Sequence, residues 1–262
     1  LTAFGPIVPQ HSGHYGNYIP NPALELSKAL ASMKDNQGRV VIPGFYDGIS
    51  LDAATKKILE GVPTEDMAIK ERTQTKSNDR VGNTYQESIQ FPSLNIRGLQ
   101  SGWVGDEART IIPATATAEL DIRLVVESDP YKLIDGVKTH LINQGFTVLD
   151  HQPTKEERMS QDRIIQMTSN VAYPAFRTAT QSKEGKWLSA LLTDYYNEKP
   201  VIIRTSGGSV PISPFVSELG VPAIGVPTVN LDNNQHSPNE NLRVGNYLTG
   251  IESFLAILTS KF

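Results

Sequence analysis

The sequence predicts an α+β module followed by part of an α/β domain, with a boundary near residue 178. Up to that residue, strand and helix signals follow the order strand, helix, strand, strand, helix, strand, which is typical of a small antiparallel sheet with helices on one face. Beyond it, short apolar strand signals alternate with helices, the pattern of a parallel sheet. We therefore expect one domain at residues 1–178 and another at 179–262.

Two helix starts in the first module are strongly marked. Asn21-Pro22 and Asp129-Pro130 each place an N-cap residue before a proline at the first helical position. Apolar residues follow both at helical spacing, and the glycine-containing segments 35–38 and 144–145 should end the two helices. Residues 51–60 predict a further helix.

The longest strand signal runs from Thr110 to Val126. Within it, Leu120, Ile122 and Leu124 alternate with charged residues, so one face should be buried and the other charged. Other strands are expected at 1–8, 92–97, 146–149 and 163–167, and a glycine-rich loop at 98–105. In the second domain we expect buried strands at 201–204 and 223–226, and helices at 187–196, 210–219 and 244–258.

Composition excludes several classes of partner. The net charge of −4 leaves no basic surface for nucleic acid, and no apolar window is long enough to cross a bilayer. With no cysteine, the chain has no disulfide, thiolate metal ligand or cysteine nucleophile. We expect a soluble protein, in the cytoplasm rather than exported, although the compartment stays open.

His236 lies in a polar loop between a predicted strand and the last predicted helix. Open α/β sheets bind ligands beyond the carboxyl ends of their strands, so this histidine could hold a metal ion. Taken alone, it is more often an ordinary surface histidine.

The segment Gly207-Gly208-Ser209 should join a strand to a helix. Two glycines let the backbone approach a ligand closely, and amides at a helix start attract a carboxylate, to which Ser209 could add a hydroxyl donor. A tight turn capped by a serine explains the same residues equally well.

His11 and His14 have the spacing of a helical metal-binding pair, yet Gly13 and Gly16 argue against a helix there. A closed zinc site needs about four ligands, and no others are near in the sequence, so a hydrogen bond from His11 to a substrate is the favoured role. Arg123 could either pair with a neighbouring carboxylate or clamp a substrate carboxylate, and both remain open.

Four segments carry a family resemblance in their order along the chain. They are His11-Ser12-Gly13, Thr110-Ile111-Ile112-Pro113 ahead of Asp121-Ile122-Arg123-Leu124, Gly207-Gly208-Ser209, and His236-Ser237-Pro238-Asn239-Glu240. Together they resemble the zinc-dependent exopeptidases and amidohydrolases that include carnosine dipeptidases, aminoacylases and bacterial glutamate carboxypeptidases. The resemblance implies that residues 1–178 are a lid or dimerisation domain whose first strand is truncated. Residues 179–262 would then be the C-terminal part of a zinc-exopeptidase catalytic domain.

The resemblance also implies roles for single residues. The family uses two zinc ions per active site, and His236 matches the last metal ligand. His11 matches a catalytic histidine that reaches across a homodimer, through the lid, and stabilises the oxyanion of the partner's substrate; Thr110 matches a second residue supplied in this way. Arg123, Gly207, Gly208 and Ser209 match groups that bind the substrate, in particular its terminal carboxylate.

The function implied is a metallo-exopeptidase that hydrolyses dipeptides or removes the C-terminal residue of peptides. One alternative is an amidohydrolase that deacylates N-acyl amino acids, and another is a non-catalytic dimerisation module. The His-x-Asp motif, Glu-Glu pair and further acidic ligand of the family would lie N-terminal to Leu1, where the first strand of the lid would also begin. We therefore expect the chain to be inactive by itself.

Overall fold

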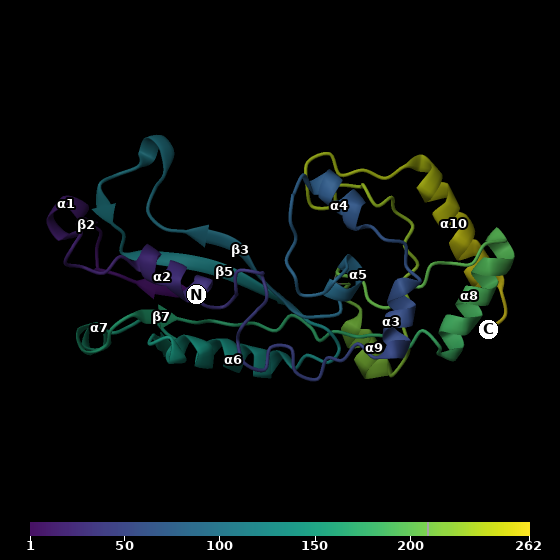
Figure 1. Ribbon diagram of the computed structural model, residues 1–262, viewed down its shortest axis with the longest axis horizontal. Helices are drawn as coiled ribbons and strands as arrows, with labels where there is room; N and C mark the ends of the chain where they lie inside the picture. The colour runs from purple at the N-terminus through teal and green to yellow at the C-terminus, as the bar shows by residue number, and fades with distance from the viewer. Residues whose placement is uncertain (209) are drawn as a thin grey trace. The chain divides into compact units, whose positions relative to one another are not determined.

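The computed structural model describes residues 1–208 and 210–262, which form two compact units. The first unit contains Leu1–Ser50 and Thr64–Ala175, and the second contains Leu51–Pro63 and Phe176–Phe262 (Figure 1). None of the helices in the described chain is long and apolar enough to cross a membrane.

The first unit contains all the strands that are assigned in the described residues. These strands are β1 (Thr2–Phe4), β2 (Gln10–His11), β3 (Ser93–Gln100), β4 (Ile111–Ile112), β5 (Thr115–Arg123), β6 (Thr147–Leu149) and β7 (Ile164–Gln166). Its helices are α1 (Ser12–Tyr15), α2 (Pro22–Ala31), α4 (Asp66–Thr73), α5 (Tyr85–Ser88), α6 (Pro130–Asn143) and α7 (Lys155–Ser160), with a short 3-10 turn at Gly105–Glu107.

Five strands form one sheet in the order β3-β5-β1-β7-β6, and β2 pairs with β4 in a separate two-stranded sheet. The neighbours in the larger sheet are antiparallel except β6 and β7, which are parallel. A parallel pair needs a long crossover, and the segment that contains α7 supplies it. The expected small sheet is therefore confirmed, with one parallel pair at its edge.

One face of this sheet is covered by α2 and α6. Alternate residues of β5, Ala116 and Ala118, are buried against this layer, together with Leu26 of α2, Met33 just beyond its end and Leu141 of α6. The opposite face of β5 carries threonines and charged residues, as its period-2 pattern predicts. The expected arrangement of helices on a single face is confirmed.

The two marked helix starts are confirmed. The side chain of Asn21 accepts a hydrogen bond from the Ala23 amide at the start of α2, and Asp129 caps α6 in the same way through Tyr131 and Lys132. Each cap satisfies amides that have no partner inside the helix, which is why these short signals specify a boundary well.

Arg163 joins several of these elements. Its Nε donates to Glu25 Oε2 of α2 at 2.8 Å, and its NH1 donates to the Gln144 carbonyl at the end of α6 at 2.7 Å. The guanidinium carbon also lies 3.9 Å from the centroid of the Phe146 ring. Arg163 makes these contacts from the left-handed backbone region, with φ of 51°.

Two strand boundaries differ from expectation. The strand β3 continues to Gln100, so the first part of the predicted 98–105 loop is extended, and a register shift between Ile96 and Gly98 leaves Arg97 as the extra residue of a bulge. The predicted long strand from Thr110 to Val126 is broken into β4 and β5. Pro113 lies at this break, because proline cannot donate a ladder hydrogen bond.

The second unit contains α3 (Ala53–Glu60), α8 (Lys183–Tyr196), α9 (Ser213–Leu219) and α10 (Val244–Thr259). The Tyr196 hydroxyl of α8 lies 2.7 Å from Ser253 Oγ of α10, so these two helices are side by side. Gly250 brings α10 close to Thr228, since a Cβ at this position would lie 2.9 Å from the Thr228 side chain.

The strands expected at 201–204 and 223–226 are not formed, and this part of the prediction is wrong. Val201, Ile202 and Ile203 are 53%, 40% and 46% exposed, so the apolar run is not a buried strand here. The backbone of Ala223 is paired with the Thr178 hydroxyl, which donates to its carbonyl at 2.7 Å and accepts from its amide at 3.0 Å. A side chain thus satisfies the groups that a neighbouring strand would bind.

Candidate functional site

The first group of candidate residues lies on the two-stranded sheet. His11 of β2 pairs with Ile111 of β4, and the Ser12 amide donates to the Thr110 carbonyl at 3.0 Å. His11 and Thr110, which are 99 positions apart in the sequence, are therefore neighbours at the two-stranded β2–β4 sheet, and both residues are exposed. The structure thus brings together the two residues that the resemblance linked.

His11 is held by the start of α1, although the sequence argued against a helix there. Its Nδ1 accepts a hydrogen bond from the Gly13 amide at 3.0 Å, so the imidazole is the N-cap of a one-turn helix over Ser12–Tyr15. The prediction was wrong because a side-chain acceptor at the N-cap can stabilise a single turn despite its glycines. The His14 ring lies 4.7 Å from that of His11, centroid to centroid.

Arg123 is not part of the β2–β4 sheet. It is the last residue of β5, eight residues beyond Thr115, and a strand rises about 3.3 Å per residue, so roughly 26 Å of strand separates these two positions. The Arg123 Nε donates to Asp121 Oδ2 at 2.9 Å, and the arginine side chain is 57% exposed. Of the two roles considered for this residue, a solvated ion pair is the one formed here.

His236 lies in the second unit, in a polar loop between residues 230 and 243. The loop turns sharply: His236, Asn234 and Asn239 all have positive φ, between 54° and 63°. Asparagine and histidine are both enriched among the few non-glycine residues with positive φ, and the asparagine side chain can also bond locally. The imidazole is exposed at this turn.

A buried asparagine closes the loop that carries His236. Asn230 is 4% exposed, and its Nδ2 donates to Asp232 Oδ1 at 2.9 Å and to Asn241 Oδ1 at 3.1 Å. Its Oδ1 accepts from the Arg243 amide at 3.0 Å. One amide side chain therefore fixes both ends of the loop.

An ion pair between Asp232 and Arg243 reinforces this closure. The hydrogen bond from Asn230, and then that from Arg243, lower the pKa of the Asp232 carboxyl. The role of Asn230 was not predicted from the sequence. The signal for it is the density of asparagine and aspartate around a single histidine, since these residues form side-chain turns.

The glycine-rich segment does not lead directly into a helix. Gly207 and Gly208 are exposed and irregular, and α9 begins only at Ser213, with Pro214 in its first turn, rather than near Pro211 as expected. Ser209 lies outside the described residues. The expectation that helix amides adjoin these glycines is therefore wrong.

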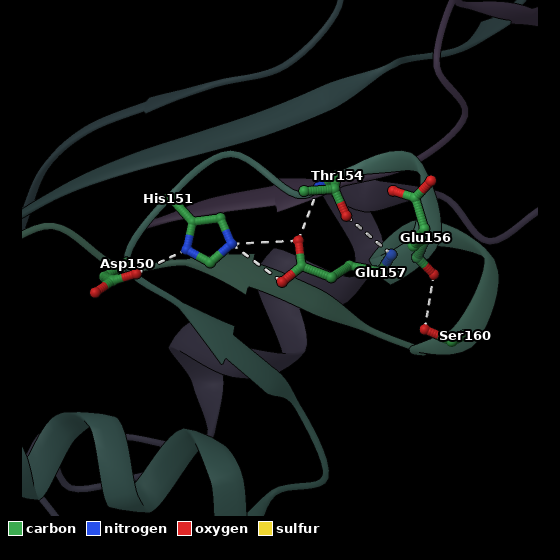
Figure 2. Close-up of polar contacts among 6 residues, drawn as sticks. All are labelled: Asp150, His151, Thr154, Glu156, Glu157 and Ser160. Atoms are coloured by element: carbon green, nitrogen blue, oxygen red, sulfur yellow. Dashed lines mark hydrogen bonds and ion pairs between the residues drawn. The ribbon is translucent and has the colours of Figure 1, made fainter.

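Another histidine, His151, lies near the start of α7 between two acidic residues (Figure 2). His151 Nδ1 lies 2.8 Å from Asp150 Oδ1, and its Nε2 lies 3.0 Å from Glu157 Oε1. Glu157 and Thr154 form a reciprocal capping box with each other. The hydrogen bond to Asp150, followed by that to Glu157, raises the pKa of His151. We interpret this exposed cluster as a helix cap.

The described histidine and acidic side chains do not form a zinc site by themselves. Histidine is a common zinc ligand, so His236 could supply one, but a closed site takes about four ligands. Within residues 1–208 and 210–262, no group of three or more histidine, cysteine, aspartate or glutamate side chains is placed to hold a metal ion. These residues do not fit a zinc site by themselves, and no reaction step is derived through a metal.

A family profile described as a peptidase dimerisation domain matches residues 2–146, more than half of the 262 residues. The chain belongs to the M20 peptidase dimerisation-domain family. The family resemblance inferred from the four motif segments is thereby confirmed.

The M20 chain is also similar to characterised enzymes. It is 29% identical over 254 residues to the Cys-Gly metallodipeptidase DUG1 of Candida albicans, covering 95% of this chain and 50% of the relative. It is 24% identical over 259 residues to the Beta-Ala-His dipeptidase of Rattus norvegicus, covering 94% and 48%. The chain spans about half the length of these curated relatives.

Among solved structures, the M20 family metallo-carboxypeptidase Sso-CP2 from Sulfolobus solfataricus superimposes with a TM-score of 0.75 at 25% sequence identity. The match covers 98% of this chain and 56% of that one. The likeness therefore extends to both units and is not confined to the matched dimerisation domain.

Proposed function

We propose that this M20 chain acts in a metal-dependent exopeptidase that hydrolyses dipeptides or removes the C-terminal residue of peptides. The observation that carries the proposal is the similarity over 95% of the chain to a relative named as a metallodipeptidase. Residues 1–178 act as the lid and dimerisation domain, apart from 51–63, which are grouped with the second unit, and residues 179–262 belong to the catalytic domain.

Within this proposal, two histidines have different roles. His11 donates a hydrogen bond to the oxyanion that forms at the scissile carbonyl, and Thr110 lies beside it on the same element. His236 is a ligand of one of two zinc ions. Arg123 and the Gly207–Ser209 segment bind the terminal carboxylate of the substrate, which requires Arg123 to exchange Asp121 for the ligand.

The protein is proposed to form a homodimer through the lid. The family description as a dimerisation domain supports this, and β3 lies at the edge of the five-stranded sheet, where its backbone can pair with another strand. Sedimentation velocity on the purified protein measures this directly. A purely monomeric species at micromolar concentration would contradict the proposal.

The test uses the gene product as it is made in its own cells, supplied with zinc. A substrate panel contains dipeptides with α and β peptide bonds, longer peptides and N-acyl amino acids. We expect hydrolysis of at least one peptide class. Cleavage of N-acyl amino acids alone would identify a deacylase, and no hydrolysis of any class would leave a dimerisation module without catalysis.

Two substitutions separate the proposed roles. His11→Ala should retain bound zinc and lower turnover about 100- to 1000-fold, the usual loss for one oxyanion donor. His236→Ala should lose zinc, measured by elemental analysis. His151→Ala is the matched control, because this exposed histidine lies in the α7 cap and should change neither. Equal loss of zinc in His11→Ala, or full zinc in His236→Ala, would refute the assigned roles.

A further inference from the structure

We propose that Gly13 is a positioning residue for His11: its amide holds the imidazole in the tautomer that carries the proton on Nε2. The hydrogen bond between Gly13 N–H and His11 Nδ1 measures 3.0 Å. A backbone amide can only donate, so Nδ1 must present its lone pair. A neutral imidazole has a single N–H, which is then on Nε2.

The glycine is required for this contact for a steric reason. A Cβ at position 13 would lie 2.8 Å from His11 Cε1, a distance that real Cβ atoms essentially never show, and 3.1 Å from His11 Nδ1, so the imidazole would have to shift. The positive-φ glycines do not include Gly13, so backbone freedom is not the explanation. A side chain at residue 13 would therefore displace the imidazole from its position over the Gly13 amide.

Neighbouring groups further restrict the imidazole. The His14 ring packs 4.7 Å from the His11 ring at an interplanar angle of 42°. The Ser12 amide donates a hydrogen bond to the Thr110 carbonyl, which connects the start of α1 to the β2–β4 sheet. Among the described residues, His11 Nε2 forms no hydrogen bond, so its proton is available to a ligand.

The functional meaning of this arrangement rests on the proposed role of His11. A donor aimed at a developing oxyanion is effective when it is already in position and already carries its proton. A freely rotating histidine would have to order its side chain in each turnover. Gly13 removes that requirement without touching the substrate.

The arrangement can be observed in the protein before any substitution. In a ¹⁵N-labelled sample, a long-range NMR experiment should detect a scalar coupling across the hydrogen bond between Gly13 N and His11 Nδ1. The ring nitrogen shifts should identify Nδ1 as the unprotonated atom. A protonated Nδ1 in the neutral ring would overturn the proposal irrespective of how any variant folds.

Gly13→Ala provides the second arm. The methyl group should displace the ring and abolish the coupling, whereas Gly98→Ala should retain it, since a Cβ at Gly98 meets only ordinary contacts at 3.7 Å. Persistence of the coupling in Gly13→Ala would refute the steric argument. If the coupling is lost, turnover by the intact gene product should fall towards that of His11→Ala with zinc unchanged. Unchanged turnover would then refute the positioning role.

These results distinguish two failures. If the native protein hydrolyses nothing but shows the coupling and its loss in Gly13→Ala, the positioning of His11 stands and the proposed peptidase function fails. If hydrolysis depends on His11 but no coupling is found, the function stands and the role of Gly13 fails.

Discussion

Replacing Arg163 should reveal how much one side chain contributes to the first unit. Arg163→Ala removes a hydrogen bond to the Gln144 carbonyl, a partly exposed ion pair with Glu25 and a contact with the face of Phe146. These contribute about 1 kcal/mol, up to about 1 kcal/mol and about 0.5–1 kcal/mol, respectively. We therefore expect a loss of about 2–3 kcal/mol in the free energy of unfolding.

Arg163→Gly makes the prediction sharper. Both variants lose the same contacts, but the backbone of residue 163 has a φ of 51°, which costs a residue with a Cβ about 1–2 kcal/mol. The glycine variant should therefore be about 1 kcal/mol more stable than the alanine variant, the reverse of the usual order. Arg97→Ala is the control, because its ion pair with Glu119 is exposed and should be worth less than about 1 kcal/mol.

Urea unfolding followed by Trp103 fluorescence, in a Trp187→Phe background, reports on the first unit. A glycine variant no more stable than the alanine variant would refute the backbone argument, and two variants close to wild type would refute the contact argument. Burial disfavours the Glu25 carboxylate, but hydrogen bonds from Lys28 and Arg163 outweigh it and lower its pKa. This stabilisation is present above the unfolded pKa of about 4.3 and is lost as pH falls through the folded pKa. The difference in the free energy of unfolding between wild type and Arg163→Ala should therefore become smaller as the pH falls through this range.

Three other outcomes are expected. Leu141→Ala should cost about 2–5 kcal/mol in the same unfolding assay, because this side chain is fully buried beneath the sheet; a loss below 1 kcal/mol would contradict this packing. The pKa of His151, measured by NMR titration, should exceed about 6.5 and fall in Glu157→Gln; its stabilising effect is present below the unfolded pKa and disappears as pH rises through the folded pKa. Asn230→Ala should increase hydrogen exchange across residues 230–243, since it deletes three hydrogen bonds; unchanged protection would show that the loop closes without it.

Local signals in the sequence determined much of the first unit. The caps at Asn21 and Asp129 were predictable because each acts on amides two or three residues away. The buried face of β5 followed from simple alternation of its residues. What alternation does not contain is the partner strand, and so the parallel pairing of β6 with β7 was not foreseen.

The errors in the second unit have a related cause. Residues 201–203 are as apolar as a buried strand, but a strand exists only through backbone hydrogen bonds to a neighbour. Composition describes the side chains of that segment and carries no information about the partner. The hydroxyl of Thr178, which bonds both backbone groups of Ala223, could not be anticipated from a separation of 45 residues.

The candidate site shows the same division between local and long-range information. The resemblance named His11 and Thr110, but their adjacency arises from the pairing of β2 with β4. Gly13 was noticed as a residue unfavourable to helix, whereas its proposed role depends on the short distance, 2.8 Å, at which a Cβ added there would meet the imidazole. Such a close approach is a property of three-dimensional structure and leaves no spacing pattern in the sequence.

The distance between Arg123 and the β2–β4 sheet, which carries His11, constrains how the proposed site can be assembled. Roughly 26 Å of β5 lies between Thr115 and Arg123, whereas an extended dipeptide spans about 7 Å. One substrate cannot contact His11 and Arg123 of the same copy unless the first unit itself unfolds. The two proposed roles are compatible only if each site takes these residues from different copies of the chain.

Mixing two inactive variants tests this conclusion. When the His11→Ala and Arg123→Ala forms of the intact gene product are co-expressed in equal amounts, half of the dimers should be mixed, and each mixed dimer should contain one site with both residues intact and one with neither. Activity should therefore return to about a quarter of the wild-type level. If both residues acted within one copy, each site of a mixed dimer would lack one of them, and activity would stay at the level of the single variants. That result would require at least one of the two residues to be removed from the proposed site.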